Sequence, residues 1–225
     1  MRRKTAAFLA VLGVLAAAAA LVDTASGRPV GSAKAWKPHV DQTAGFRIDI
    51  PANWQVIPRS VAALKDRIRT LRAEGRIALA DQYKALLDDP YQRQQLRTFR
   101  FSAFQWPALP SPITSDVYVK IAAVPASVQT SDLPAIARVI ADELKGPGSH
   151  VGPVRRIRLP AGAGVLLTGS AKLDPSYRAK ATGFRLYLFL RPRRLFQLGF
   201  RTDSAFAASQ RVLFISIASR FGFLR

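Results

Sequence analysis

The sequence predicts a sandwich domain of the α+β or α/β class behind an N-terminal export segment. Apolar residues recur at helical spacing near both ends of the folded part, and shorter runs between them alternate apolar and polar residues as strands do. The chain has 225 residues. The roughly 200 that follow the export segment suffice for one domain with a substantial core. A sheet covered by helices buries both patterns at once.

The export segment is the first feature along the chain. Arg2, Arg3 and Lys4 precede an apolar run over residues 6–22, and small residues follow at the exit. This pattern predicts a secretory signal peptide over residues 1–27, cleaved after Ser26 or Gly27. The run of 17 residues also reaches the lower limit for a membrane span, so an uncleaved N-terminal anchor is the alternative. In both cases the domain is expected to be extracytoplasmic: in a periplasm, in a cell wall, secreted or anchored to a membrane.

The chain contains no cysteine, although export would permit disulfides. Stability must therefore come from packing, and a lipid anchor at the signal junction is excluded because it requires a cysteine. Residues 28–43 are polar, carry Pro29, Gly31 and Pro38, and have no period. They are predicted to be a linker, with the folded domain over residues 44–225.

The first elements of the domain are a strand and a long helical segment. Phe46, Ile48 and Ile50 alternate with charged residues, which predicts a half-buried strand that Pro51 ends, and Trp54 follows in a short loop. Ser60 can cap the helical segment. Gly75 is expected to bend or break it, and the segment ends near Asp88-Asp89-Pro90. Its apolar stripe consists of Val61, Leu64, Ile68, Leu71, Leu79, Tyr83 and Leu86.

The remaining elements are strands and two more helices. Residues 98–104 and 117–124 read as strands on either side of a proline-rich loop. Asp132 can cap a helix with Pro134 in its first turn and Leu133, Ile136, Ile140 and Leu144 on one face, and Gly146-Pro147-Gly148 ends it. Four further strands are predicted, with a tight turn at Pro192-Arg193 and a closing helix over residues 204–220. These strands span residues 154–159, 164–173, 182–190 and 194–201.

Both ends of this domain resemble a known family. The run Gly45-Phe46-Arg47-Ile48-Asp49-Ile50-Pro51-Ala52-Asn53-Trp54 is similar to the first strand of PsbP-like proteins, including the LpqN-type exported proteins of actinobacteria. The hairpin over residues 184–200, the helix with Phe214-Ile215-Ser216-Ile217-Ala218-Ser219, and Phe221-Gly222-Phe223 resemble the end of that family. The resemblance implies an α/β/α sandwich around a mainly antiparallel sheet, and an accessory or interaction module. The segment over residues 60–87 is longer than this family's pattern there.

The positive charge is concentrated in the C-terminal third. The full chain has a net charge of +20, to which residues 28–150 contribute 17 basic and 11 acidic side chains and residues 151–225 contribute 14 and 2. Such a surface attracts polyanions such as phospholipid headgroups, anionic wall polymers or nucleic acid. The competing explanation is coding bias, because 25 of the 34 basic residues are arginine and alanine is abundant. No specific nucleic-acid binding is expected.

Motifs for catalysis, metals or cofactors do not emerge from the sequence. His39 and His150 are far apart and are expected to be solvated, so no metal site is predicted. No Gly-x-Ser-x-Gly elbow is present, and the carboxylate pairs Asp88-Asp89 and Asp142-Glu143 read as helix ends. No cofactor is expected.

One glycine-rich run imitates a phosphate-binding loop. Gly164 and Gly169 have the glycine spacing of that motif, but Ser170-Ala171-Lys172 places the lysine two positions late. The run also alternates like a strand. A core strand flanked by glycines is therefore predicted.

A basic hairpin is the remaining candidate site. Arginine binds phosphate and carboxylate groups through two parallel hydrogen bonds. The alternative is that the aromatic residues Tyr187, Phe189 and Phe196 pack inward while the arginines only solvate the outer face. Arg155, Arg156 and Arg158 could neighbour the hairpin. The candidate ligand-binding residues are Arg185, Arg191, Arg193, Arg194 and Arg201.

These observations predict a non-catalytic, exported binding or accessory protein of the cell envelope. Its partner is expected to be a protein or an anionic envelope component, and membrane association is expected through an uncleaved N-terminus or the basic surface. The competing prediction is an extracytoplasmic enzyme whose active site has no recognisable motif. A deep pocket with convergent carboxylate, hydroxyl or imidazole groups would favour the enzyme.

Overall fold

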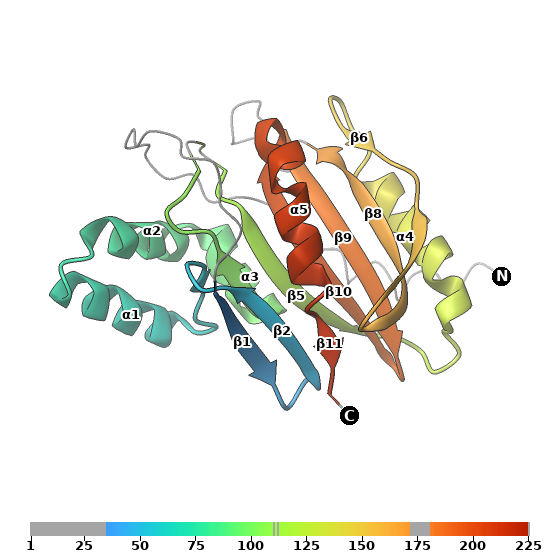
Figure 1. The fold of residues 1–225 in the computed structure, drawn as a ribbon, viewed down its shortest axis with the longest axis horizontal. Helices are drawn as coiled ribbons and strands as arrows, with labels where there is room; N and C mark the ends of the chain where they lie inside the picture. Colours follow the sequence, from blue (N-terminus) through green and yellow to red (C-terminus); the bar gives the residue numbers. More distant parts are fainter. Residues whose placement is uncertain (1–34, 110, 112, 172–180, 225) are drawn as a thin grey trace.

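The computed structural model describes residues 35–224 except 110, 112 and 172–180. The predicted signal segment therefore lies outside the described residues. Within them the fold is an α+β sandwich of two antiparallel sheets and five α-helices (Figure 1). No helix in the described part of the chain is long and apolar enough to cross a membrane.

The larger sheet has the strand order β3-β4-β5-β10-β9-β8-β6, and β7 also pairs with β8. All of its strand pairs are antiparallel. Its strands are β3 (Gln55–Val56), β4 (Phe99–Phe104), β5 (Asp116–Ala123), β6 (His150–Val151), β7 (Arg155–Leu159), β8 (Gly162–Ala171), β9 (Thr182–Arg191) and β10 (Arg194–Asp203).

The smaller sheet has the order β1-β2-β11 and consists of β1 (Trp36–Asp41), β2 (Phe46–Pro51) and β11 (Gly222–Phe223). The linker prediction is therefore wrong for Trp36–Asp41. This stretch has no apolar alternation of its own, but all of it pairs with β2: Trp36 lies opposite Pro51, and Asp41 lies opposite Phe46. Pairing with β2 therefore makes this polar stretch an edge strand of the small sheet.

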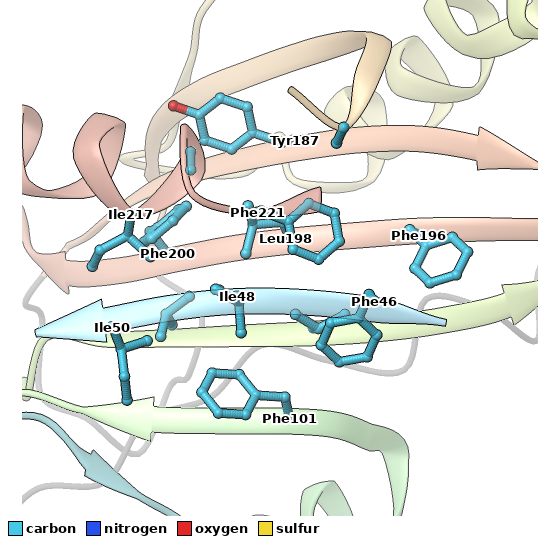
Figure 2. Packing of buried hydrophobic residues seen from close by; sticks show 14 of the residues in the cluster. Phe46, Ile48, Ile50, Phe101, Tyr187, Phe196, Leu198, Phe200, Ile217 and Phe221 are labelled. Atoms are coloured by element: carbon cyan, nitrogen blue, oxygen red, sulfur yellow. The ribbon is translucent and has the colours of Figure 1, made fainter. Parts of the chain in front are cut away.

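The small sheet and α5 (Ala207–Ala218) cover one face of the large sheet (Figure 1). Phe46, Ile48 and Ile50 of β2, with Phe221, are buried there against Phe101 and residues of β9 and β10. Figure 2 shows these side chains between the strands. The predicted strand at residues 46–50 is thereby confirmed.

On the opposite face lies α4 (Leu133–Glu143), which buries Leu133, Ala137 and Ile140 against β8 and β9. Asp132 precedes this helix without capping it. Its carboxylate instead accepts a hydrogen bond from the Gln129 N–H, at 2.9 Å. The reason is a short 3₁₀ turn, η2 (Thr130–Asp132), that leads into the helix.

Three helices extend from the β4 side: α1 (Val61–Ala73), α2 (Ile77–Asp88) and α3 (Pro90–Thr98) (Figure 1). Ser60 caps α1, since its Oγ accepts the Ala63 N–H. Gly75 separates α1 from α2 with a φ of 72°. The stripe residues from Leu64 to Leu86 pack together with Phe104, whereas Val61 is exposed. The sequence interpretation did not anticipate α3, because its composition is almost wholly polar.

The run from Gly164 to Gly169, whose glycine spacing resembles that of a phosphate-binding loop, is part of the buried strand β8, as expected. A Cβ at Gly164 would lie 2.5 Å from the Leu188 carbonyl oxygen, and one at Gly169 would lie 2.3 Å from the His150 carbonyl oxygen. Both glycines therefore permit close packing around β8. Gly199 of β10 is similarly confined, because its Cβ would lie 2.1 Å from the Tyr118 ring.

Candidate functional site

The turn between β9 and β10 brings two of the predicted arginines together. Arg191 ends β9 and Arg194 begins β10, and the two are direct partners in the antiparallel register. Pro192 and Arg193 form the predicted tight turn between them. Arg193 has φ of 60°, a left-handed conformation that costs an ordinary residue about 1 kcal/mol. Its carbonyl accepts a hydrogen bond from the Val124 N–H at 3.0 Å, which fixes the turn to the end of β5.

Contacts from distant parts of the chain position this arginine pair, which we define as Arg191 and Arg194. The Arg191 guanidinium carbon lies 4.2 Å from the centroid of the Phe223 ring on β11. Arg194 Nη1 lies 3.5 Å from the Ala44 carbonyl oxygen at the β1–β2 turn. Both arginines are exposed, and neither forms an ion pair within the described part of the chain. Aromatic and carbonyl groups thus hold the pair and leave its charge uncompensated.

The electrostatics of the arginine pair favour an anion. Like charges directly opposite each other on antiparallel strands destabilise the pairing by about 0.2–1 kcal/mol. An oxyanion that bridges the two guanidinium groups removes this repulsion and accepts several charge-assisted hydrogen bonds. The arrangement can therefore bind a phosphate or carboxylate group, but it contains no nucleophile or general base.

An open groove adjoins the turn on the side of α4. Its volume is about 640 Å³. The loop before α4 supplies polar groups to it, namely the amide of Gln129 and the hydroxyls of Thr130 and Ser131. The remaining lining residues are Ala126, Val128, Leu190, Arg191, Pro192 and Arg193. The sequence interpretation missed this loop, because polar residues ahead of a helix are also typical of ordinary capping.

Arg185 lies apart from the arginine pair. It is six residues before Arg191 on the same strand, which corresponds to about 20 Å. Its partner across the β8–β9 register is Thr168, and its Nε lies 3.4 Å from the Tyr187 hydroxyl. Arg155, Arg156 and Arg158 are also separated from the hairpin, since β8 lies between β7 and β9.

Arg201, one of the five predicted ligand-binding arginines, does not belong to the exposed arginine pair. Its residue surface is 6% exposed, and its Nε donates to both carboxylate oxygens of Asp116 at 2.9 and 3.0 Å. Burial raises the pKa of the Asp116 carboxyl, while the Arg201 guanidinium opposes that shift. Arg201 therefore has a counter-ion inside the fold, because its strand pairs with β5 at Asp116.

The alternative is confirmed for the aromatic residues, since Tyr187, Phe189 and Phe196 are buried, but it is wrong in placing the arginines on the opposite face. Residues 185, 187, 189 and 191 point to the same face of β9, since side chains alternate along a strand. That face packs against α5 and the small sheet, and the opposite face, with Leu186 and Leu188, packs against α4. The hairpin is thus buried on both faces, and its exposed arginines are those at the turn.

No group of three histidine, cysteine or acidic residues that could hold a metal occurs among the described residues. His150 is exposed in β6, whereas His39 is half-buried in β1 with its ring centroid 4.4 Å from that of Phe101. The expectation of two solvated histidines is therefore wrong for His39. Its ring became part of the core edge because β1 pairs with β2 instead of forming a linker.

Comparisons with known proteins identify the fold. The chain resembles the solved structure of cyanobacterial PsbP (CyanoP) from Synechocystis, with a TM-score of 0.53 and 11% sequence identity over 88% of this chain and 98% of that one. It also resembles LpqN of Mycobacterium tuberculosis, which is described as involved in cell envelope biogenesis, with a TM-score of 0.52 and 9% identity over 85% and 91%.

The chain has a PsbP-like fold. No family model and no curated sequence matches it. The resemblance inferred from the two ends of the domain is thus confirmed for the fold, including its α+β sandwich and its mainly antiparallel sheet.

Proposed function

We propose that the chain is an exported, non-catalytic accessory protein of the cell envelope, whose arginine pair binds an anionic envelope surface. One observation carries the proposal: the β9–β10 register places two exposed arginines opposite each other, and no carboxylate of the described residues forms an ion pair with either. The description of LpqN as a protein of cell envelope biogenesis supports the location. The excess of basic residues after residue 150 supports the choice of an anionic surface.

Binding at the arginine pair would need little reorganisation. The Phe223 ring and the Ala44 carbonyl already hold the two guanidinium groups, so less side-chain entropy is lost when an anion binds. Arg193 and the groove with Thr130 and Ser131 extend the polar surface beyond the pair. A phosphate headgroup would bridge Arg191 and Arg194 on the side of the turn that faces the small sheet.

Sedimentation with phospholipid vesicles tests the proposal. The naturally processed protein is mixed with neutral vesicles and with vesicles that contain phosphatidylglycerol. The test variant Arg191→Gln/Arg194→Gln is compared with Arg156→Gln/Arg158→Gln, which removes the same charge from exposed positions on β7. A basic side chain near an anionic surface contributes about 1 kcal/mol, so the test variant should bind about thirtyfold more weakly. The control should retain most of the binding.

Salt and a lysine variant separate a specific site from diffuse attraction. Exposed charges are screened over about 8 Å at physiological ionic strength, so diffuse binding falls steeply as salt rises. Bidentate binding resists salt better, and Arg191→Lys/Arg194→Lys should lose it although the charge is kept. Equal losses in test and control variants would contradict the proposal. Binding to an acidic protein but not to anionic vesicles would show that the partner is a protein and not an envelope surface. No binding to either at low salt would favour coding bias as the origin of the positive charge.

A further inference from the structure

A small cavity lies between α5 and the large sheet, at the opposite end of β9 from the arginine pair. Its volume is about 120 Å³. Arg185 is the one charged residue among its described lining, which consists of Thr168, Gly169, Gly183, Phe184, Arg185, Thr202, Ala207 and Phe214. The cavity therefore combines a half-buried cation with an apolar wall from α5.

Arg185 has fewer protein partners than its donors require. A guanidinium group carries five N–H donors. Within the described part of the chain, Arg185 has a contact of 3.4 Å from Nε to the Tyr187 hydroxyl, and its guanidinium carbon lies 5.9 Å from the centroid of that ring. Figure 2 shows the Tyr187 hydroxyl pointing away from the labelled phenylalanines. A partly buried cation without a counter-ion is costly, and a bound anion would offset that cost.

Thr168 supplies a second donor. It is the direct partner of Arg185 in the β8–β9 register, so both side chains lie on the same face of the sheet. Thr202 also lines the cavity, but its hydroxyl is already hydrogen-bonded to the Ser115 hydroxyl at 2.7 Å. Opposite these groups, Ala207 and the buried Phe214 present an apolar surface. One cation, one hydroxyl and an apolar wall suit a singly charged ligand.

We propose that this cavity binds the carboxylate of a small organic acid, with Arg185 and Thr168 as donors and α5 against its apolar part. The cavity volume equals that of about four water molecules at about 30 Å³ each, which fits a carboxylate group that carries one or two further carbon atoms. Doubly charged phosphate lacks a second cation here. The site is separate from the arginine pair and goes beyond the envelope-binding function.

Nuclear magnetic resonance titration of the naturally processed protein tests this site. Acetate and propionate should shift the Arg185 Nε–H resonance and the backbone amides of Gly169 and Gly183 saturably. Chloride and inorganic phosphate at the same ionic strength should not. Arg185→Gln should raise the dissociation constant at least about tenfold, and Thr168→Val should raise it several-fold. Arg156→Gln, which removes an exposed charge on β7, is the matched control and should bind as the wild type does.

Additional variants and ligands distinguish this site from its alternatives. Arg185→Lys retains the charge but loses the paired donors, so it should also bind weakly, and its amide spectrum reports whether the fold is intact. Equal shifts with chloride, or no saturable shift with either acid, would overturn the proposal. A short peptide with blocked ends and one glutamate is tested in the same way. If it binds and propionate does not, the ligand is an acidic side chain of a protein and the proposal of a small organic acid is overturned. Arg191→Gln/Arg194→Gln should bind propionate normally, so this site and the envelope-binding function can fail independently.

Discussion

At the scale of single residues, the same side chain has different roles because of its position in the sheet. Arg201 and Arg194 both belong to β10, but they lie seven residues apart, about 23 Å along the strand. Arg201 meets Asp116 on β5 and is buried, whereas Arg194 meets Arg191 at the turn and is exposed. Composition showed an excess of arginine in this region. Register decided which arginine has a counter-ion.

His39 is a second residue whose role depends on its neighbours. Its ring contacts Phe101, and burial lowers the pKa of its imidazole, while the nearby Asp41 carboxylate acts in the opposite direction. Asp41 itself is bonded to Arg100 of β4, with Nη2 to Oδ2 at 2.8 Å. These two contacts attach β1 to the large sheet.

Protonation of His39 should weaken the fold. Because its folded pKa lies below the unfolded value of about 6.5, the unfolded chain takes up the proton first, and stability falls as the pH drops through 6.5 toward the folded pKa. His39→Gln should show a smaller loss of unfolding free energy between about pH 7 and pH 5.5 than the wild type does. Urea unfolding at each pH measures this. His150→Gln, which replaces the exposed histidine of β6, is the control. If His39→Gln lost as much unfolding free energy over this pH range as the wild type does, the assignment would be contradicted.

At the scale of elements, periodic apolar residues predicted α1 and α2 well. Leu64 and Leu71 are fully buried and Ile68 nearly so, while Arg69 and Arg72 are exposed and Arg67 is half-buried. By contrast, α3 and β1 are polar segments that packing against other elements orders: Leu96 of α3 joins the cluster of α1 and α2, and β1 pairs with β2 and contacts β4. Local periodicity cannot reveal such elements, because the groups that stabilise them lie elsewhere in the chain.

Leu64→Ala should cost about 2–5 kcal/mol of unfolding free energy, because the removed methyl groups leave a cavity among α1, α2 and Phe104. Val61→Ala is the matched control in the same helix, since Val61 is 36% exposed and should change stability by less than about 0.5 kcal/mol. Chemical denaturation measures both variants. A loss below about 0.5 kcal/mol for Leu64→Ala would show that the cluster does not contribute to the cooperative fold.

At the scale of the whole molecule, the acidic residues are largely used within the fold. Asp49, Asp66, Asp81 and Asp88 pair with nearby basic residues on exposed surfaces, and Asp41 and Asp116 pair across strands. Such exposed pairs add little stability. They do offset positive charge over the first two thirds of the domain, so the uncompensated charge is concentrated after residue 150.

Export predicts where the mature chain begins. Cleavage after Ser26 or Gly27 would leave Trp36–Asp41 intact, so β1 could still pair with β2. Mass spectrometry of the intact protein from the extracytoplasmic fraction should therefore find a chain that starts at Gly27 or Arg28. A full-length chain embedded in membranes would instead establish the N-terminal anchor.

The sequence by itself determined the class of the fold, most of its helices and strands, and the hairpin turn at Pro192-Arg193, because these depend on local periodicity and turn chemistry. It also placed the arginines of the candidate site in one hairpin. Tertiary structure decided what surrounds each arginine: Asp116 of β5 pairs with Arg201, whereas Phe223 and the Ala44 carbonyl, from opposite ends of the domain's sequence, contact Arg191 and Arg194. Those contacts join residues up to 150 positions apart, and no local pattern encodes such a pairing.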